Sequence, residues 1–119
     1  SVPSDSPQTK VGRIVFDATA ITTTDSVVVN LGFTPKYICW ENLTDRIKNE
    51  WFEGMAANSA VNTVANGTRT LSVTGTNGGF TVCNADGTAN VGGKCFSILQ
   101  NVTLGAILAS KTVTWIAKG

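Results

Sequence analysis

Short runs of β-branched and aromatic residues, separated by turn residues, constrain this chain more than any other feature. Val, Ile and Thr are abundant and helix formers are scarce. β-branched side chains lose rotamer freedom in a helix but pack well on a pleated sheet. The runs recur at intervals of roughly 8–12 residues, as in sandwiches and small barrels. The sequence therefore predicts an all-β fold, a single-domain β-sandwich (jelly-roll-like or small barrel) of about seven to eight short strands.

The clearest expected pair is a hairpin of Lys36–Leu43 with Ile47–Glu53. The first run is apolar at both parities, which is typical of a central strand covered on two faces. In the second run Lys48 and Glu50 share one parity while Ile47 and Trp51 share the other, so one face is buried. Further strands are expected at Val11–Asp17, Ser26–Leu31, Arg69–Val73, Phe80–Cys83, Lys94–Leu99 and Thr112–Ala117, with Met55–Asn66 as an irregular loop and Thr103–Ala109 as a short helix or a crossing loop.

The chain divides into an extended N-terminal arm, residues 1–10, and a β-sandwich domain, residues 11–119. The arm is polar and contains two prolines, a composition that cannot bury a core of its own. Such a segment gains order on a partner, so we expect the arm to be a contact element. The candidate partner-binding residues of the arm are Ser1, Val2, Pro3, Ser4, Asp5, Ser6, Pro7, Gln8, Thr9 and Lys10.

Composition excludes several function classes. The chain has no histidine, so Ser-His and Cys-His nucleophile pairs and His-ligated metal sites are absent. Its net charge is +1 and its basic residues are dispersed, which argues against nucleic-acid binding. No apolar run approaches the roughly 18 residues of a membrane-spanning helix. We therefore expect a binding or structural domain that is not an enzyme and needs no cofactor, metal, nucleic acid or membrane.

Three cysteines, Cys39, Cys83 and Cys95, lie in apolar strand-like runs without a C-x-x-C pattern. The favoured interpretation is three buried thiols, and the alternative is a Cys83–Cys95 bridge across a hairpin. The segment Asn84–Asn90 has alternating oxygen donors, but it holds a single carboxylate and an Asp-Gly turn pair. A turn is expected there rather than a calcium site.

Two groups of side chains invite a functional interpretation. Glu41, Glu50 and Glu53 could form a carboxylate pair, but nearby lysines and arginines are the more natural partners on a solvated strand. The second group could form a platform on which sugar rings stack: Trp40, Trp51, Trp115, Tyr37 and Phe52. Large rings in alternating strands more often lie in the core, and we expect this of Trp40 and Trp115. Phe52 shares the parity of Lys48 and Glu50, so we expect it to be exposed and to contact a partner.

Two segments carry a resemblance to a known group of proteins. They are Leu31–Ile38, which reads LGFTPKYI, and Asn42–Met55, which reads NLTDRIKNEWFEGM. A Thr-Arg-Thr-Leu strand, a Gly-rich turn with an aromatic, and the closing Val113–Ala117 strand follow in order. This pattern, over roughly residues 11–118, resembles small tailed-phage virion structural proteins, most like head decoration (cement) proteins.

The resemblance implies a bacteriophage capsid decoration protein that binds the major capsid protein, stabilises the head and has no catalytic activity. It implies a homo-oligomer, with a trimer as one form, made in the host cytoplasm and located on the capsid surface of the virion. The alternatives are a tail-fibre or tail-associated module that binds a receptor or glycan, and a tail or connector component. Glycan binding through an exposed aromatic would distinguish the first alternative, and copy number per particle would distinguish the second.

Overall fold

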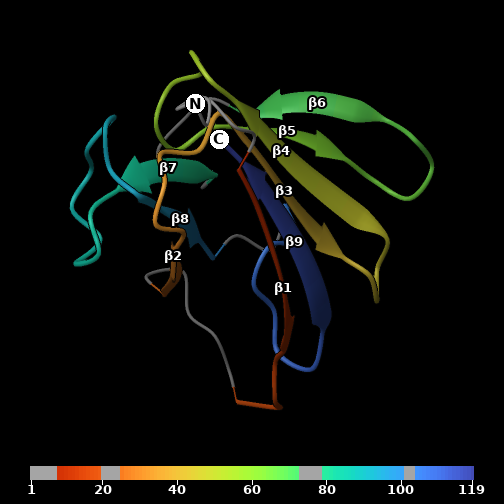
Figure 1. The fold of residues 1–119 in the computed structure, drawn as a ribbon. Coiled ribbons are helices and arrows are strands. Elements are labelled where there is room, and N and C mark those ends of the chain that lie inside the picture. The colour runs from red at the N-terminus through yellow and green to blue at the C-terminus, as the bar shows by residue number, and fades with distance from the viewer. Residues whose placement is uncertain (1–7, 20–24, 73–78, 101–103) are drawn as a thin grey trace.

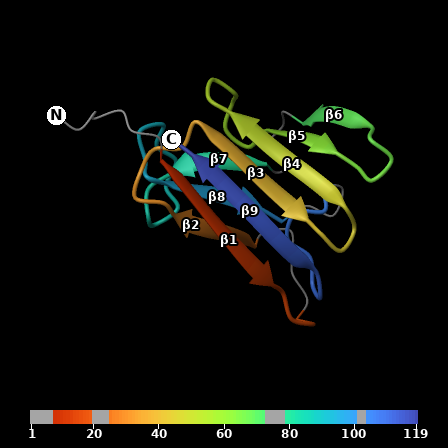
Figure 2. The same cartoon turned by 45° about the vertical axis from the view of Figure 1, so that its right-hand side comes forward.

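The computed structural model describes residues 8–19, 25–72, 79–100 and 104–119, which form nine strands in two antiparallel sheets and no helix. The larger sheet has the order β1 (Thr9–Val15), β9 (Thr112–Lys118), β3 (Tyr37–Asn42), β4 (Ile47–Phe52), β5 (Ala60–Thr63) and β6 (Arg69–Ser72). The smaller sheet has the order β2 (Ser26–Asn30), β8 (Cys95–Leu99) and β7 (Phe80–Cys83). The two sheets form a sandwich-like pair of layers (Figures 1 and 2), which confirms the predicted all-β class.

The core lies between the sheets and is centred on Phe96 of β8. Its ring makes edge contacts with Trp40 of β3 and Trp115 of β9, at centroid distances of 6.2 and 5.7 Å. Phe80 of β7 contacts the same ring at 5.9 Å. Edge-to-face pairs add specific geometry to the burial of large apolar area. The expectation that Trp40 and Trp115 are core residues is confirmed, because both are almost completely buried.

The predicted hairpin is the pair β3–β4, with Tyr37 opposite Phe52 and Asn42 opposite Ile47. The strand β5 lies within Met55–Asn66, which the sequence predicts as an irregular loop, so that prediction is wrong for Ala60–Thr63. The inward positions of β5 are Ala60 and Asn62, so a polar residue stands where alternation would place an apolar one. Asn62 is buried there because its amide donates to the Asn49 side-chain oxygen at 2.8 Å.

An irregular segment, Leu104–Ile107, crosses the inner face of the larger sheet and is buried. It is a loop, one of the two forms expected for this region. Its carbonyl groups accept hydrogen bonds from buried side chains of the sheet, as a buried backbone without a ladder partner requires. These are Trp40 Nε1 to Ala106 at 2.7 Å, Asn42 Nδ2 to Gly105 at 3.1 Å and Asn49 Nδ2 to Leu104 at 2.9 Å.

Two glycines permit close packing in this region. Gly105 has φ +62°, a conformation that L side chains rarely adopt, and a Cβ there would meet Ile47 Cδ1 at 2.7 Å. Gly12 of β1 lies opposite Trp115, and a Cβ at Gly12 would collide with the indole ring. Because Gly12 has no side chain, the Trp115 ring can pack directly against β1.

The turn between β3 and β4 is connected to the chain that enters β9. The Asp45 carboxylate accepts from Lys111 Nζ at 3.1 Å and from Asn42 Nδ2 at 2.9 Å. The same Asn42 amide donates to the Gly105 carbonyl. Hydrogen bonds from Lys111 and Asn42 hold the pKa of Asp45 below its ordinary value.

The hydrogen bonds to the buried segment predict a large effect of Asn49→Ala. We expect the free energy of unfolding to fall by about 1–3 kcal/mol, because a carbonyl and the Asn62 amide lose a buried partner. Urea unfolding followed by tryptophan fluorescence measures the change. Asn30→Ala, an exposed asparagine of β2, is the matched control and should have little effect. Equal effects of the two substitutions would contradict the assignment.

The Asp45 interactions predict a pH dependence. The folded-state pKa lies below the ordinary 3.8, so the stabilisation is present above about pH 4 and is lost as pH falls through the folded-state value. Asp45→Asn should therefore lower stability at neutral pH and reduce its loss in acid. Asp17 and Asp86 shift in the same direction and remain in the variant, so the readout is the difference between the two curves. Parallel curves for the variant and the original protein would refute the prediction.

Candidate binding surfaces

The face of the larger sheet that points away from the core is here called the outer face. One row of directly opposed residues on it crosses four strands: Thr9 of β1, Lys118 of β9, Tyr37 of β3 and Phe52 of β4. Opposed residues of antiparallel strands point to the same side, so these four side chains share one surface. Three strand spacings separate Thr9 from Phe52, a distance of about 14 Å.

Tyr37 and Phe52 form the aromatic end of this row, and contacts with neighbouring side chains hold their rings in place. The Tyr37 and Phe52 rings lie 5.2 Å apart, and Lys118 Nζ lies 5.9 Å from the centre of the Tyr37 ring. The Tyr37 hydroxyl donates to the Glu50 carboxylate at 2.6 Å. Desolvation, together with this hydrogen bond, raises the pKa of Tyr37, so the phenol is protonated and acts as a donor.

The three carboxylates do not converge on one point. Lys48 is opposite Glu41, and its ammonium lies 3.8 Å from the Glu50 carboxylate. Glu41 and Glu50 are therefore outer-face groups next to a cation, as expected for a solvated strand. Glu53 follows β4 with the parity of Trp51 and lies on the other side of the sheet, at the rim of a pocket.

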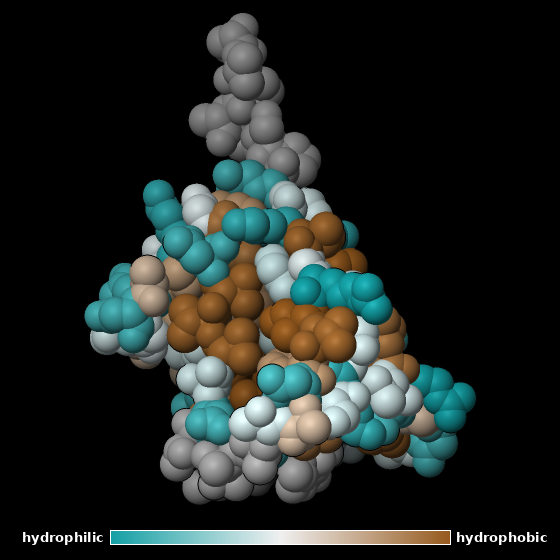
Figure 3. All heavy atoms as spheres, turned by 90° about the horizontal axis from the view of Figure 1, so that it is seen from below, coloured by the Kyte–Doolittle hydropathy of each residue, from teal (hydrophilic) through white to brown (hydrophobic). Residues whose placement is uncertain are grey.

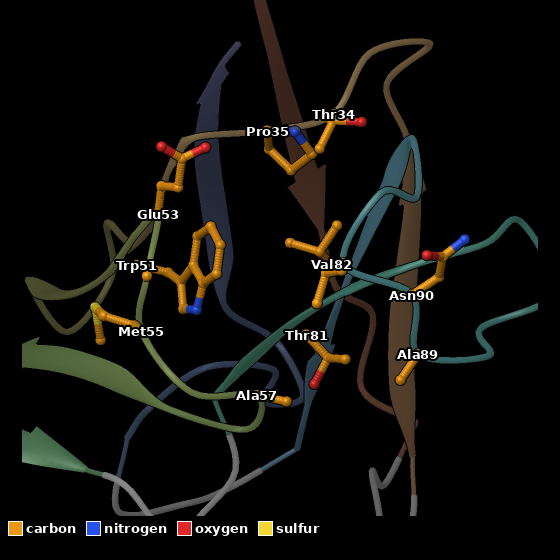
Figure 4. Close-up of a pocket in the computed structure, with 12 residues that line it drawn as sticks. Thr34, Pro35, Trp51, Glu53, Met55, Ala57, Thr81, Val82, Ala89 and Asn90 are labelled. Carbon is orange, nitrogen blue, oxygen red and sulfur yellow. The ribbon is translucent and has the colours of Figure 1, made fainter.

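This pocket lies between the end of β4 and the edge of β7, with a volume of about 530 Å³ (Figure 4). Trp51, Glu53 and Met55 line one side, and Val82 of β7 lies across from the Trp51 ring. Thr81 of β7 also lines the pocket, and the other lining residues come from the connecting segments around it: Thr34, Pro35, Gly54, Ala57, Ala89, Asn90 and Val91. Its size is in the range of small-molecule and side-chain binding sites.

The predicted partner-binding residues fall into two groups. Phe52 lies on the outer face, 40 % exposed, on the side that strand alternation predicts. Within the predicted arm, Gln8, Thr9 and Lys10 are exposed, and Thr9 and Lys10 already belong to β1. Residues 1–7 lie outside the described residues. Partner binding by either group stays a prediction.

Other exposed apolar residues occur on several elements. One face of the molecule has apolar groups at its centre and polar groups around them (Figure 3). Apolar atoms make up a large part of any protein surface, so the exposure of an apolar residue does not by itself indicate a function. They include Val11, Val15, Val28, Leu43, Leu71 and Val91. Phe52 differs from them because its ring packs against Tyr37 in the outer-face row that begins at Thr9.

The segment Asn84–Gly93 is a turn region, as expected. It lies against the side of the smaller sheet that points away from the core: a Cβ at Gly93 would collide with the Cys83 backbone, and one at Gly87 would lie 3.6 Å from Val28. In the turn, Asp86 accepts from the Thr88 N–H at 2.9 Å. No group of three or more metal-ligating side chains occurs in the described part of the chain, and none of its residues form a helix suited to crossing a membrane.

The sequence did not predict the pocket. Trp51 is buried and Glu53 is exposed, as the sequence predicts, but neither prediction indicates a cavity between them and β7. The spacing Trp51-x-Glu53 at the end of a strand was the available signal, because it places an aromatic ring and a carboxylate on the same side. The opposite wall comes from residues about thirty positions later, and only the fold brings them near.

Comparison with known proteins adds no relative: no protein-family model, curated protein or solved structure matches this chain.

The cysteine environment predicts unreactive thiols. Cys39, Cys83 and Cys95 are free and buried, and desolvation raises the pKa of Cys39 and Cys83. We expect no reaction with Ellman's reagent at neutral pH in the native protein, and three equivalents in guanidinium without reductant. Because Cys83 is directly opposite Cys95, one equivalent under denaturing conditions would reveal a disulfide and disprove the assignment of three free thiols.

Proposed function

We propose that this chain is a tailed-phage virion structural protein that decorates the capsid, binds the major capsid protein and stabilises the head. The observation that carries the proposal is the row from Thr9 to Phe52 on the outer face. Thr9, the one arm residue in this row, and Phe52 share the outer face, whereas Lys10 has the opposite parity and donates to the Asn30 carbonyl at 2.9 Å. The sequence resemblance to small phage virion proteins supplies the identity of the partner.

The construction of the sheet supports a docking role. Neighbouring strands and ring contacts hold Tyr37, Phe52 and Lys118 in place, so little side-chain freedom would be lost when a partner covers them. A central aromatic pair with charged neighbours is a common composition for an interface hot spot. We propose that the leading segment adds contact area beyond the rigid sheet.

The proposed role is non-catalytic. Tyr37, Glu50 and Lys48 form a cross-strand network on an open sheet, with the Tyr37 proton held by its hydrogen bond to Glu50. Such a network can hold the side chains of a contact surface in place without taking part in a reaction. A homo-oligomer, including a trimer, is part of the proposal because copies on a capsid meet at its symmetry axes.

The proposal predicts that both contact elements are needed for occupancy on phage heads. Deletion of residues 1–7 leaves β1 intact, and Phe52→Ser removes the exposed ring, so both proteins should fold. We expect each change to weaken binding to heads lacking the protein by about tenfold or more, as for interface hot spots. Co-sedimentation of purified protein with heads gives the affinity. Val91→Ser changes an apolar residue that is 93 % exposed on another loop, and it is the control expected to bind normally.

The outcomes separate the alternatives. Full occupancy of the heads by both variants would show that neither the outer-face row nor the leading segment is needed for binding. A handful of copies per particle, located on the tail, would favour a tail or connector component. Specific glycan binding that is lost in Phe52→Ser would favour a receptor-binding module.

A further inference from the structure

The pocket beside β4 presents one carboxylate above an apolar interior. Trp51 and Glu53 point to the same side because they are two residues apart at the end of a strand. The Glu53 N–H donates to the Lys36 carbonyl at 2.8 Å, which fixes the backbone at the rim. In Figure 4 the Trp51 ring reaches into the pocket, and Glu53 lies above it near Pro35.

Glu53 takes part in neither of the two ion pairs among the described residues, which are Lys48–Glu50 and Lys111–Asp45. Its recorded contact with Lys36 is a hydrogen bond between backbone groups, and Lys36 is not among the residues that line the pocket. The carboxylate is therefore available to a ligand. Below it, the pocket offers the indole ring, the Met55 thioether and the Val82 side chain, which prefer apolar atoms and, at the ring face, a cation.

We propose that this pocket binds a cationic group carried on an apolar stem, as in an arginine or lysine side chain of a partner or a free alkyl cation. The stem would lie between Trp51 and Val82, and the cation would be at the rim against Glu53. A guanidinium or ammonium group there gains a charge-assisted hydrogen bond, whereas a neutral group of the same shape does not. This site is on the core side of β4, away from the outer face, and does not depend on the proposed location in the virion.

Butylguanidinium is the probe, and N-butylurea, its neutral counterpart, is the matched ligand control. Binding to the isolated full chain is followed by the NMR signals of the indole N–H groups. Trp51 Nε1 is directed to the Ala56 carbonyl at 3.4 Å beside the pocket, whereas Trp40 Nε1 is bound to the Ala106 carbonyl in the core. We expect a saturable shift of the Trp51 signal, millimolar affinity, and little change at Trp40. Butylurea should bind roughly three- to fivefold more weakly, the effect of a partly exposed ion pair.

Two variants test the roles of charge and space. Glu53→Gln should reduce the affinity for butylguanidinium to that for butylurea, whereas Glu41→Gln, the same charge change on the outer face, should not. Ala57→Leu adds volume at the pocket wall and should weaken both ligands. No shift of Trp51 with either ligand, or equal affinity for both ligands in the unchanged protein, would overturn the proposal.

The source of the cation is then distinguished on phage heads. If the ligand is a side chain of the capsid protein, Glu53→Gln weakens binding to heads. Butylguanidinium then also inhibits the binding of the unchanged protein to heads. If the ligand is a free alkyl cation, head binding is unchanged while the Trp51 shift persists. A protein that does not bind heads but shows the charge-selective shift would refute the proposed virion role and leave the pocket assignment intact.

Discussion

Hydrogen bonds from buried side chains to the backbone of Leu104–Ile107 are the interaction on which the rest of this structure depends. A chain segment without ladder partners can lie in a core only if its carbonyl groups find donors. Trp40, Asn42 and Asn49 supply those donors from two adjacent strands. After a turn at Leu108–Lys111 the chain enters β9, which lies between β1 and β3. The same contacts therefore close the core and place the strand that joins the N-terminal strand to the sheet.

Strand alternation divides one short sequence between two surfaces. In the run from Glu50 to Glu53, Glu50 and Phe52 point to the outer face, while Trp51 and Glu53 point to the pocket side. The proposed docking surface and the proposed cation pocket are thus made by adjacent residues. The strand backbone keeps them apart, so a substitution on one side can be tested with little effect on the other.

Much of this arrangement could be predicted from local pattern. The β3–β4 hairpin, the burial of Trp40 and Trp115 and the exposure of Phe52 follow from residue type and a period of two. Strand β5 could not be predicted that way, because its inward position is Asn62. An asparagine is acceptable there only when Asn49 and the Leu104 carbonyl are already in place to bind it. The pocket has the same origin, since its walls come from segments far apart in the chain.

The sequence by itself determined that the chain builds its core from strands, and which side of its strongest strands is apolar. Those properties depend on neighbouring residues and on the twofold repeat of a pleated strand. The tertiary structure alone decided how four strands align so that Thr9, Lys118, Tyr37 and Phe52 share one row, and which polar side chains are buried. These depend on strand order, register and hydrogen bonds between distant residues, which local spacing does not encode.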